Sequence, residues 1–219
     1  GESLKMPNFL ASDGTNLHYL DEGEGDAIIF IHGWFADCHF FHSAFERMKS
    51  TNRCISVDLC CHGESEAPVN NRTISRLSED LNDLFEYLKL DKAMLVCHSM
   101  GALVAFGYVD KWGCDKISSL AVLDMSPKPL TDPEWTHGAM SMDIKGGDAA
   151  MRQNMVNLFI SSGFSLLAPI RAMMPFMMYI PERLEQLVPK AFFHNQYPTA
   201  TIDLWFAMLD VDYRDVLDK

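Results

Sequence analysis

The sequence predicts an α/β protein: a doubly wound, mostly parallel sheet that carries a helical cap. Over the first 124 residues, short apolar runs alternate with segments of helical periodicity. The run over 26–31 is almost continuously apolar, which is typical of a strand buried on both faces of a parallel sheet. Beyond that region prolines interrupt the chain, and residues 134–209 show helical stretches without a strand pattern. This order of elements indicates a sheet with crossover helices, followed by a helical segment.

The first half of the chain is expected to hold three strands and two helices. Strands are predicted over 16–20, 26–31 and 53–57, with a short helix over 40–48. The clearest helix spans 73–90, because its apolar side chains recur every three or four residues and form one stripe. This stripe consists of Ile74, Leu77, Leu81, Leu84 and Leu88. Thr73 is the residue type favoured as the N-cap of that helix.

The alternation continues with a strand over 93–97, a helix over 100–112 and a strand over 118–123. Gly113 is expected to end the helix, and Asp124 directly follows the last strand. Ligands of such sheets bind beyond the carboxyl ends of the strands. Segments that directly follow strands are therefore the first place to look for a site.

Three parts are expected along the chain: a sheet core over 1–126, a helical cap over 127–209, and a return to the core over 210–219. The cap segment is rich in methionine and phenylalanine. Such residues most often fill a core, although they also form adaptable apolar pocket walls. Both uses remain open for this segment.

Composition limits the partners of this protein. It has 219 residues, of which 48% are apolar, enough for one large domain or a domain with an inserted cap. A net charge of −12 argues against nucleic acid or an anionic membrane, since both attract clustered Lys and Arg. The longest apolar-rich stretch, over 166–180, is interrupted by two prolines and an arginine, so no transmembrane segment is expected.

The six cysteines favour a reduced, cytoplasmic setting. They show no regular spacing, and the chain is too large to depend on disulfides. No C-x-x-C pair with a matching His or Cys pair is present, so neither a metal nor another cofactor is predicted. The first residues lack a basic segment followed by an apolar one, so no signal peptide is expected there.

The run over 93–102 places Ser99 on a tight turn between a predicted strand and a predicted helix. Such a turn lifts the hydroxyl above the sheet edge, beside the free N–H groups of a helix N-terminus that can stabilise an oxyanion. This arrangement is typical of a nucleophilic serine. The alternative is that Ser99 only caps the following helix.

Three segments together resemble the serine-nucleophile branch of the α/β-hydrolase family. His32-Gly33-Trp34 is similar to the family's His-Gly-x turn, the segment 58–65 resembles its D-x-x-G-x-G-x-S loop, and 97–101 resembles G-x-S-x-G. The resemblance implies that Ser99 is the nucleophile. It also implies that the backbone N–H groups of Trp34 and Met100 form the oxyanion hole.

The sequence departs from this pattern at two positions. Cys61 and Cys97 stand where the family has glycines, in the loop and at the serine turn respectively. A side chain at the turn requires the adjacent strand and helix to leave room for it. Cysteine is small, so the fold is expected to accommodate both.

The catalytic base is not evident from the sequence. The resemblance implies that His32, His62 and His98 are packed, hydrogen-bonded imidazoles that orient loops. His137 and His194 lie in the expected cap, from which reaching Ser99 requires an unusual arrangement.

The family order of the triad is serine, acid, histidine, with the histidine after the last strand. The resemblance implies that the final strands, and with them the histidine, lie beyond Lys219. Asp124 is the internal candidate for the acid. Its alternatives are an acid beyond Lys219 and a role for Asp124 in bracing the following turn. An incomplete sheet would leave one edge uncovered, so self-association through that edge is expected.

We therefore expect a serine hydrolase that acts on a small apolar ester, lactone or similar acyl compound through an acyl-enzyme. The 219-residue form is expected to have little activity. Perhydrolase, haloperoxidase, carbon–carbon bond and thioester chemistry remain open, whereas an aspartate-nucleophile mechanism is disfavoured by the serine. The alternative is a non-catalytic binding protein or receptor that keeps the fold and the pocket.

Overall fold

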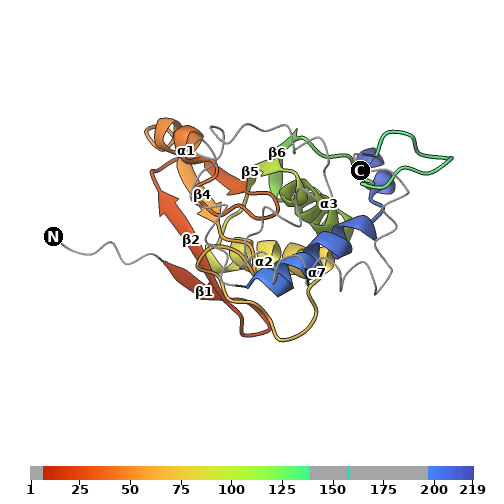
Figure 1. Cartoon of the computed structure of the whole chain (residues 1–219). Helices are drawn as coiled ribbons and strands as arrows, with labels where there is room; N and C mark the ends of the chain where they lie inside the picture. Colours follow the sequence, from red (N-terminus) through yellow and green to blue (C-terminus); the bar gives the residue numbers. More distant parts are fainter. Residues whose placement is uncertain (1–6, 139–156, 158–196) are drawn as a thin grey trace, which may run out of the picture.

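The fold is a three-layer arrangement with a six-stranded sheet in the middle (Figure 1). The computed structural model describes residues 7–138, 157 and 197–219. The strands lie in the order β1-β2-β4-β3-β5-β6. Their bounds are β1 Asn8–Leu10, β2 Asn16–Glu22, β3 Ala27–Ile31, β4 Arg53–Val57, β5 Ala93–His98 and β6 Ile117–Leu123. The last four of these run parallel to one another, and β1 and β2 are antiparallel to their neighbours. The predicted doubly wound, mostly parallel sheet is confirmed.

Helices cover both faces of the sheet. The helices are α1 His42–Met48, α2 Ile74–Tyr87, α3 Met100–Trp112 and α7 Pro198–Leu209, with a 3-10 helix, η3, over Arg214–Asp218. One face carries α2 and α3, whose buried side chains join those of the sheet in the main apolar core. The opposite face carries α1, which packs Phe45 against Ile28 and Phe30 in a smaller cluster.

The second helix shows why the periodicity of its sequence was informative. The predicted stripe faces the core, with Ile74, Leu77 and Leu84 at most 1% exposed. Thr73 caps the helix as predicted, because its hydroxyl accepts the backbone N–H of Arg76 at 3.1 Å. The helix stops at Tyr87, three residues before the predicted end.

The sequence did not predict the antiparallel start of the sheet. Strand β1 has only three residues and pairs with β2 from Asn8 opposite His18 to Leu10 opposite Asn16. Strand β2 in turn runs antiparallel to β4. Such pairing depends on which strands become neighbours, and the alternation of apolar residues does not encode it.

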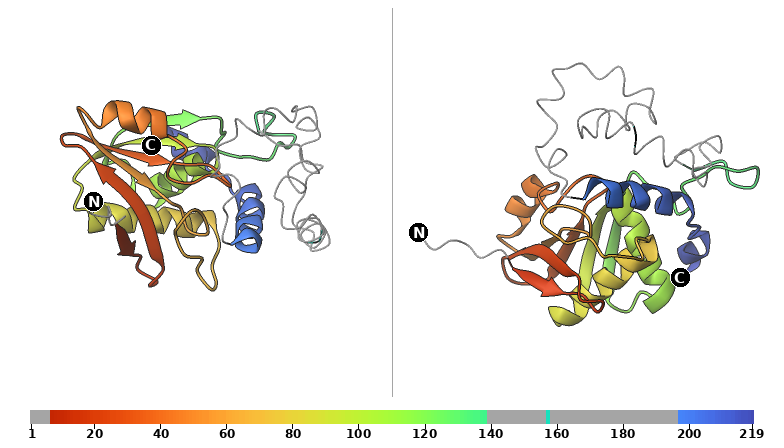
Figure 2. Two further views of the ribbon diagram at one scale, coloured as in Figure 1. Left: turned by 60° about the vertical axis from the view of Figure 1, so that its left-hand side comes forward. Right: turned by 60° about the horizontal axis from the view of Figure 1, so that its bottom comes forward.

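Most of the segment expected to form the cap lies outside the described residues, so its boundaries stay a prediction. Within it, α7 crosses the carboxyl end of the strands (Figure 2) and contributes Trp205 and Phe206 to the main core. The backbone N–H of Tyr213 donates to the carbonyl of Pro127 at 2.9 Å, which joins the start of this segment to the chain just beyond its end. No helix in the described ranges has the length and hydropathy needed to cross a membrane.

Candidate active site

Ser99 occupies the tight turn between β5 and α3. Its backbone has φ 50° and ψ −120°, a conformation that is costly for any residue except glycine. The turn is held on both sides: the N–H of Ser99 donates to Leu123 O, and its carbonyl accepts from the N–H of Ala102, both at 2.9 Å. A serine that only caps a helix does not need this strained backbone conformation, yet the fold maintains it at Ser99.

Two glycines allow the neighbouring backbone to approach this turn. A β-carbon on Gly33 would lie 3.0 Å from Cβ of Ser99, so the loop after β3 lies directly against the serine. A β-carbon on Gly101 would lie 2.4 Å from the carbonyl oxygen of Ile31, so the start of α3 presses on the end of β3. The loop after β3, the serine and the helix N-terminus thus meet in one place.

The two predicted oxyanion donors flank this meeting point. Trp34 follows Gly33 in the loop, and its backbone N–H donates to no backbone carbonyl within the described residues. Met100 is the first residue of α3, where backbone N–H groups lack a partner within the helix. Met100 follows Ser99 directly in the chain, and Trp34 follows Gly33, which lies against the serine. The role of both residues as donors stays a prediction.

A distant element braces the loop that carries Trp34. The indole N–H of Trp34 donates to the carbonyl of Thr201 in α7 at 2.6 Å. The ring of Trp34 also packs on that of Trp205, with centroids 4.3 Å apart. These contacts join residues more than 160 positions apart in sequence, so no local motif could have indicated them.

His32 and His62 are buried, hydrogen-bonded imidazoles, as predicted. His32 donates from Nδ1 to the carbonyl of Gly33 at 2.7 Å and accepts the N–H of Leu59 at Nε2 at 3.1 Å. His62 donates from Nδ1 to the carbonyl of Cys60 at 3.0 Å. Burial lowers the pKa of His32, and it lowers the pKa of His62 to about 3. Both are neutral near pH 7 and hold the loops that follow β3 and β4.

The other histidines do not supply a base within the described part of the chain. The ring of His98 stacks on Phe40 with centroids 4.6 Å apart, and burial lowers the pKa of His98. His137 is exposed and packs edge-on against Trp135. His194 lies outside the described residues. None of the described imidazoles makes a hydrogen bond with the hydroxyl of Ser99.

Asp124 directly follows β6, the strand beside β5. Its φ is 58°, and its side chain is exposed. Among the described residues no hydrogen bond of its carboxylate identifies it as part of a triad. Its role as the acid stays a prediction, as does the alternative role in the turn.

The loop after β4 is organised around the buried carboxylate of Asp58. It accepts the N–H of Cys38 at 2.6 Å, the N–H of Glu64 at 2.9 Å and Nδ1–H of His18 at 2.7 Å. Burial alone would raise the pKa of Asp58, but these hydrogen bonds hold it below its ordinary value. A β-carbon on Gly63 would lie 2.3 Å from Cγ of Asp58, so the loop turns back tightly on this carboxylate.

Comparison with known proteins agrees with this geometry. The family model described as the alpha/beta hydrolase fold matches residues 26–199, which include all three motif segments. The chain belongs to the alpha/beta hydrolase family.

Curated relatives of this alpha/beta hydrolase carry the names of different reactions. A cis-3-alkyl-4-alkyloxetan-2-one decarboxylase from Shewanella oneidensis is 27% identical over 129 residues, 57% of this chain and 40% of the relative. A putative 2-succinyl-6-hydroxy-2,4-cyclohexadiene-1-carboxylate synthase from Bacillus subtilis is 31% identical over 124 residues, 55% of this chain and 44% of the relative. The matches therefore span less than half the length of these two relatives.

A solved structure has a similar fold. The esterase EaEST from Exiguobacterium antarcticum has a TM-score of 0.77 at 23% identity, and the match covers 97% of this chain and 76% of the esterase.

This alpha/beta hydrolase accommodates its two cysteines in different ways. Cys97 is fully buried in β5, opposite Ile31 and Val122 of the neighbouring strands, so the side chain fits between them. Cys61 is also fully buried but takes a φ of 67°, the left-handed conformation that glycine adopts more easily. The strain expected from replacing glycine therefore lies in the loop at Cys61.

Proposed function

We propose that this alpha/beta hydrolase is a serine hydrolase that cleaves an ester, lactone or similar acyl compound through an acyl-enzyme on Ser99. The observation that carries the proposal is the left-handed backbone of Ser99, with φ 50°, held by the close approach of Gly33 and Gly101. A strained serine at the end of a buried strand matches the demands on an exposed nucleophile. The curated relatives do not fix the reaction, since their names describe different ones.

In the proposed mechanism, the hydroxyl of Ser99 attacks the carbonyl carbon while its proton passes to an imidazole base. The carbonyl oxygen becomes an oxyanion and accepts the backbone N–H groups of Trp34 and Met100, each worth about 3 kcal/mol in the transition state. The alcohol leaves with a proton, and water then releases the acid from Ser99. We propose Asp124 as the acid that orients the base, because it follows the strand next to β5.

The imidazole base is proposed to lie outside the described residues. In the described ranges no imidazole is bonded to the hydroxyl of Ser99, so the 219-residue chain is expected to turn over slowly. Hydrolysis of a p-nitrophenyl ester should run at least ~100-fold below that of a full-length esterase of the family, because general-base catalysis typically contributes that much.

The substrate is proposed to be small and apolar in its acyl part. The support is the methionine-rich composition of 127–209, most of which lies outside the described residues. A cytoplasmic location is also proposed, supported by six cysteines that are all free thiols.

Self-association through β6 is a further proposal for the 219-residue chain. In the described sheet β6 is one of the two edge strands, and Val122 and Leu123 are 40% and 43% exposed. An exposed parallel edge offers unpaired backbone groups to a second copy. Light scattering should show a mass that rises with concentration, and a constant monomer mass would rule the association out.

Labelling with a fluorophosphonate probe tests the proposed nucleophile. The chain should be labelled at Ser99, and Ser99→Ala should abolish the labelling. Ser126→Ala is the matched control, since this serine lies on the loop after β6 with its hydroxyl bonded to Lys128 O. Labelling that survives in Ser99→Ala, or that is absent from the folded full-length gene product, would disprove the proposal.

The second candidate function is a non-catalytic binding protein, favoured by the lack of an imidazole bonded to Ser99 in the described residues. It predicts that a non-hydrolysable apolar ester analogue binds the chain while the probe does not label it. Rapid labelling would exclude this candidate.

A further inference from the structure

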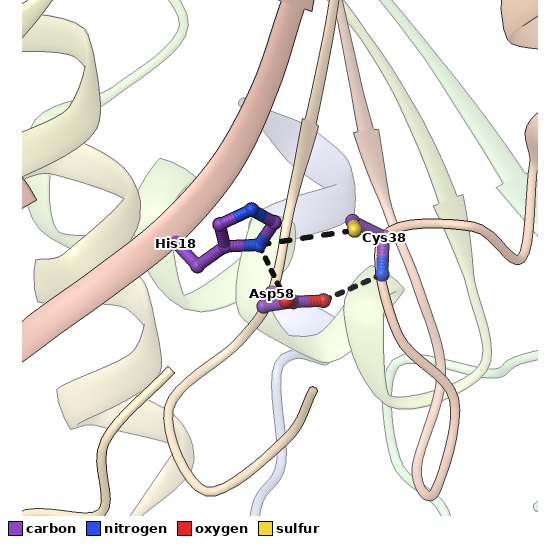
Figure 3. Close-up of side chains that lie close together, drawn as sticks. All are labelled: His18, Cys38 and Asp58. Carbon is purple, nitrogen blue, oxygen red and sulfur yellow. Dashed lines mark hydrogen bonds and ion pairs between the residues drawn. The ribbon is translucent and has the colours of Figure 1, made fainter. Parts of the chain in front are cut away.

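A second group of reactive side chains lies where β2 meets the end of β4 (Figure 3). Nδ1 of His18 lies 2.7 Å from Oδ2 of Asp58 and 3.9 Å from Sγ of Cys38. All three residues are at most 2% exposed. Their donor atoms lie within 4.8 Å of one another, so a single ion could contact all three.

The backbone fixes each of these residues before any ion binds. His18 sits beside Asp58 because the N–H of Asp58 donates to the carbonyl of His18 at 2.9 Å where β2 and β4 meet. Cys38 is held at both backbone groups: its N–H donates to Oδ1 of Asp58, and its carbonyl accepts the hydroxyl of Ser56, each at 2.6 Å. The donor set is therefore preorganised by the fold.

The donor chemistry fits zinc. One imidazole nitrogen, one sulfur and one carboxylate oxygen are all ordinary zinc ligands. Standard bond lengths in a tetrahedral site place sulfur and nitrogen ~3.6 Å apart, close to the 3.9 Å between Cys38 and His18. The nitrogen and oxygen must separate from 2.7 Å to ~3.3 Å as the ion replaces their hydrogen bond.

The balance of charge also suits a divalent ion. A thiolate and a carboxylate together balance its two positive charges, which avoids burying a net charge. Nε2 of His18 is buried and has no partner among the described residues. To bind the ion, the imidazole carries its proton on Nε2, which donates to no described residue, and turns the lone pair of Nδ1 to the ion.

The next residue in the chain, His39, lies beside the sulfur of Cys38. The side chain of His39 is 53% exposed, and its Nδ1 lies 3.4 Å from Sγ of Cys38. With Asp37 and Cys38 it forms a second group of donor atoms that lie within 4.8 Å of one another.

We propose that His18, Cys38 and Asp58 bind one zinc-type divalent cation through Nδ1, the thiolate sulfur and a carboxylate oxygen. The thiol proton leaves to solvent on binding. The ion would tie the loop that carries Trp34 to β4. This site was not predicted from the sequence, because its ligands come from three separate segments and show none of the spacings of known zinc motifs. It does not depend on the proposed hydrolase activity.

Titration of the metal-free chain with Co²⁺ tests the site. We expect one equivalent to bind and to produce a thiolate-to-cobalt charge-transfer band. Cys38→Ser should remove the band and weaken binding by at least ~100-fold. Mutating even a residue that only hydrogen-bonds to a metal ligand lowers metal affinity by about 10–100-fold. Cys114→Ser is the matched control, an exposed thiol outside the cluster, and should bind as the wild type does. No binding, or a band that persists in folded Cys38→Ser, would overturn the proposal.

X-ray absorption of the zinc-loaded wild-type chain tests the sulfur ligand even if Cys38→Ser fails to fold. One sulfur at ~2.3 Å together with nitrogen or oxygen ligands is expected. Two sulfurs would instead identify the adjacent Cys60 and Cys61, whose sulfur atoms lie 3.9 Å apart. That result, or the absence of any sulfur ligand, would refute the assignment.

Because Asp37, Cys38 and His39 form a second group of donors, His18→Asn should weaken binding and His39→Asn should not; the reverse would refute the assignment.

Discussion

A single methyl group at Gly101 would force α3 away from the end of β3. The β-carbon of Gly101→Ala would lie 2.4 Å from the carbonyl oxygen of Ile31 and 2.7 Å from that of His32. An ordinary carbon–oxygen contact is about 3.3 Å, so the overlaps are ~0.9 and ~0.6 Å. Both oxygens belong to backbone at the end of a strand paired on each side, so neither can rotate away.

We expect Gly101→Ala to lower the free energy of unfolding by about 3 kcal/mol, the upper end of the range for overpacking. If α3 moves by ~1 Å to relieve the contact, labelling of Ser99 by a fluorophosphonate should slow by about 100-fold. Urea unfolding followed by tryptophan fluorescence measures the first effect, and the labelling rate measures the second.

Gly113→Ala is the control for this substitution. A β-carbon there meets nothing within 4 Å, but the φ of 76° is unfavourable for alanine. Its ψ of −164° places it in a region that is essentially restricted to glycine, so the substitution should show only the backbone penalty, about 2 kcal/mol, and should leave the labelling of Ser99 unchanged. Gly101→Ala could lower the free energy of unfolding no more than Gly113→Ala does and leave the labelling rate of Ser99 unchanged. That result would mean that the close approach of α3 to β3 does not support the serine turn.

Three other substitutions test separate parts of the site. Ser99→Gly should be about 1 kcal/mol more stable than Ser99→Ala in urea unfolding, because glycine relieves the left-handed strain at some cost in chain entropy; equal stabilities would argue against strain. Lowering the pH from 8 to 5 should reduce the free energy of unfolding by about 2 kcal/mol through His62. In the unfolded chain this imidazole takes up a proton below its ordinary pKa of 6.5, whereas in the folded chain its pKa is about 3, so protonation favours the unfolded state. His62→Gln should reduce that loss and His137→Gln should not, as measured by urea unfolding at both pH values. Trp34→Phe should lower the free energy of unfolding by about 1 kcal/mol, because it removes the indole hydrogen bond to Thr201. No change in the urea midpoint would mean that this bond does not brace the loop that carries Trp34.

The sequence was sufficient for most elements because their signals are local. Strands β3 and β5 are apolar throughout most of their length, and α2 shows its buried stripe in the order of its residues. Strand β1 escaped prediction because three residues, one of them the 69% exposed Leu10, carry no periodicity. It exists because β2 offers it a partner, which is a property of the assembled sheet.

The same distinction applies to the site. Ser99, Trp34 and Met100 could be placed from the sequence because each closely follows a strand or starts a helix. The bracing of Trp34 by α7 could not, since it joins the two halves of the chain. The pairing of His18 with Asp58 likewise depends on β2 lying beside β4, an order that no motif encodes.

The carboxylate of Asp58 has a consequence for the order in which the molecule folds. Its partners lie 40 residues earlier at His18, 20 residues earlier at Cys38 and six residues later at Glu64. The first two contacts form only after β2, β3 and β4 have come together, because non-local contacts must first overcome the entropy of closing the chain between them. The loops beside Ser99 should therefore become ordered late, in one step, when this carboxylate finds its donors. In the native protein, the amide protons of Cys38 and Glu64 should then exchange with solvent as slowly as those of the sheet, although both residues lie in loops.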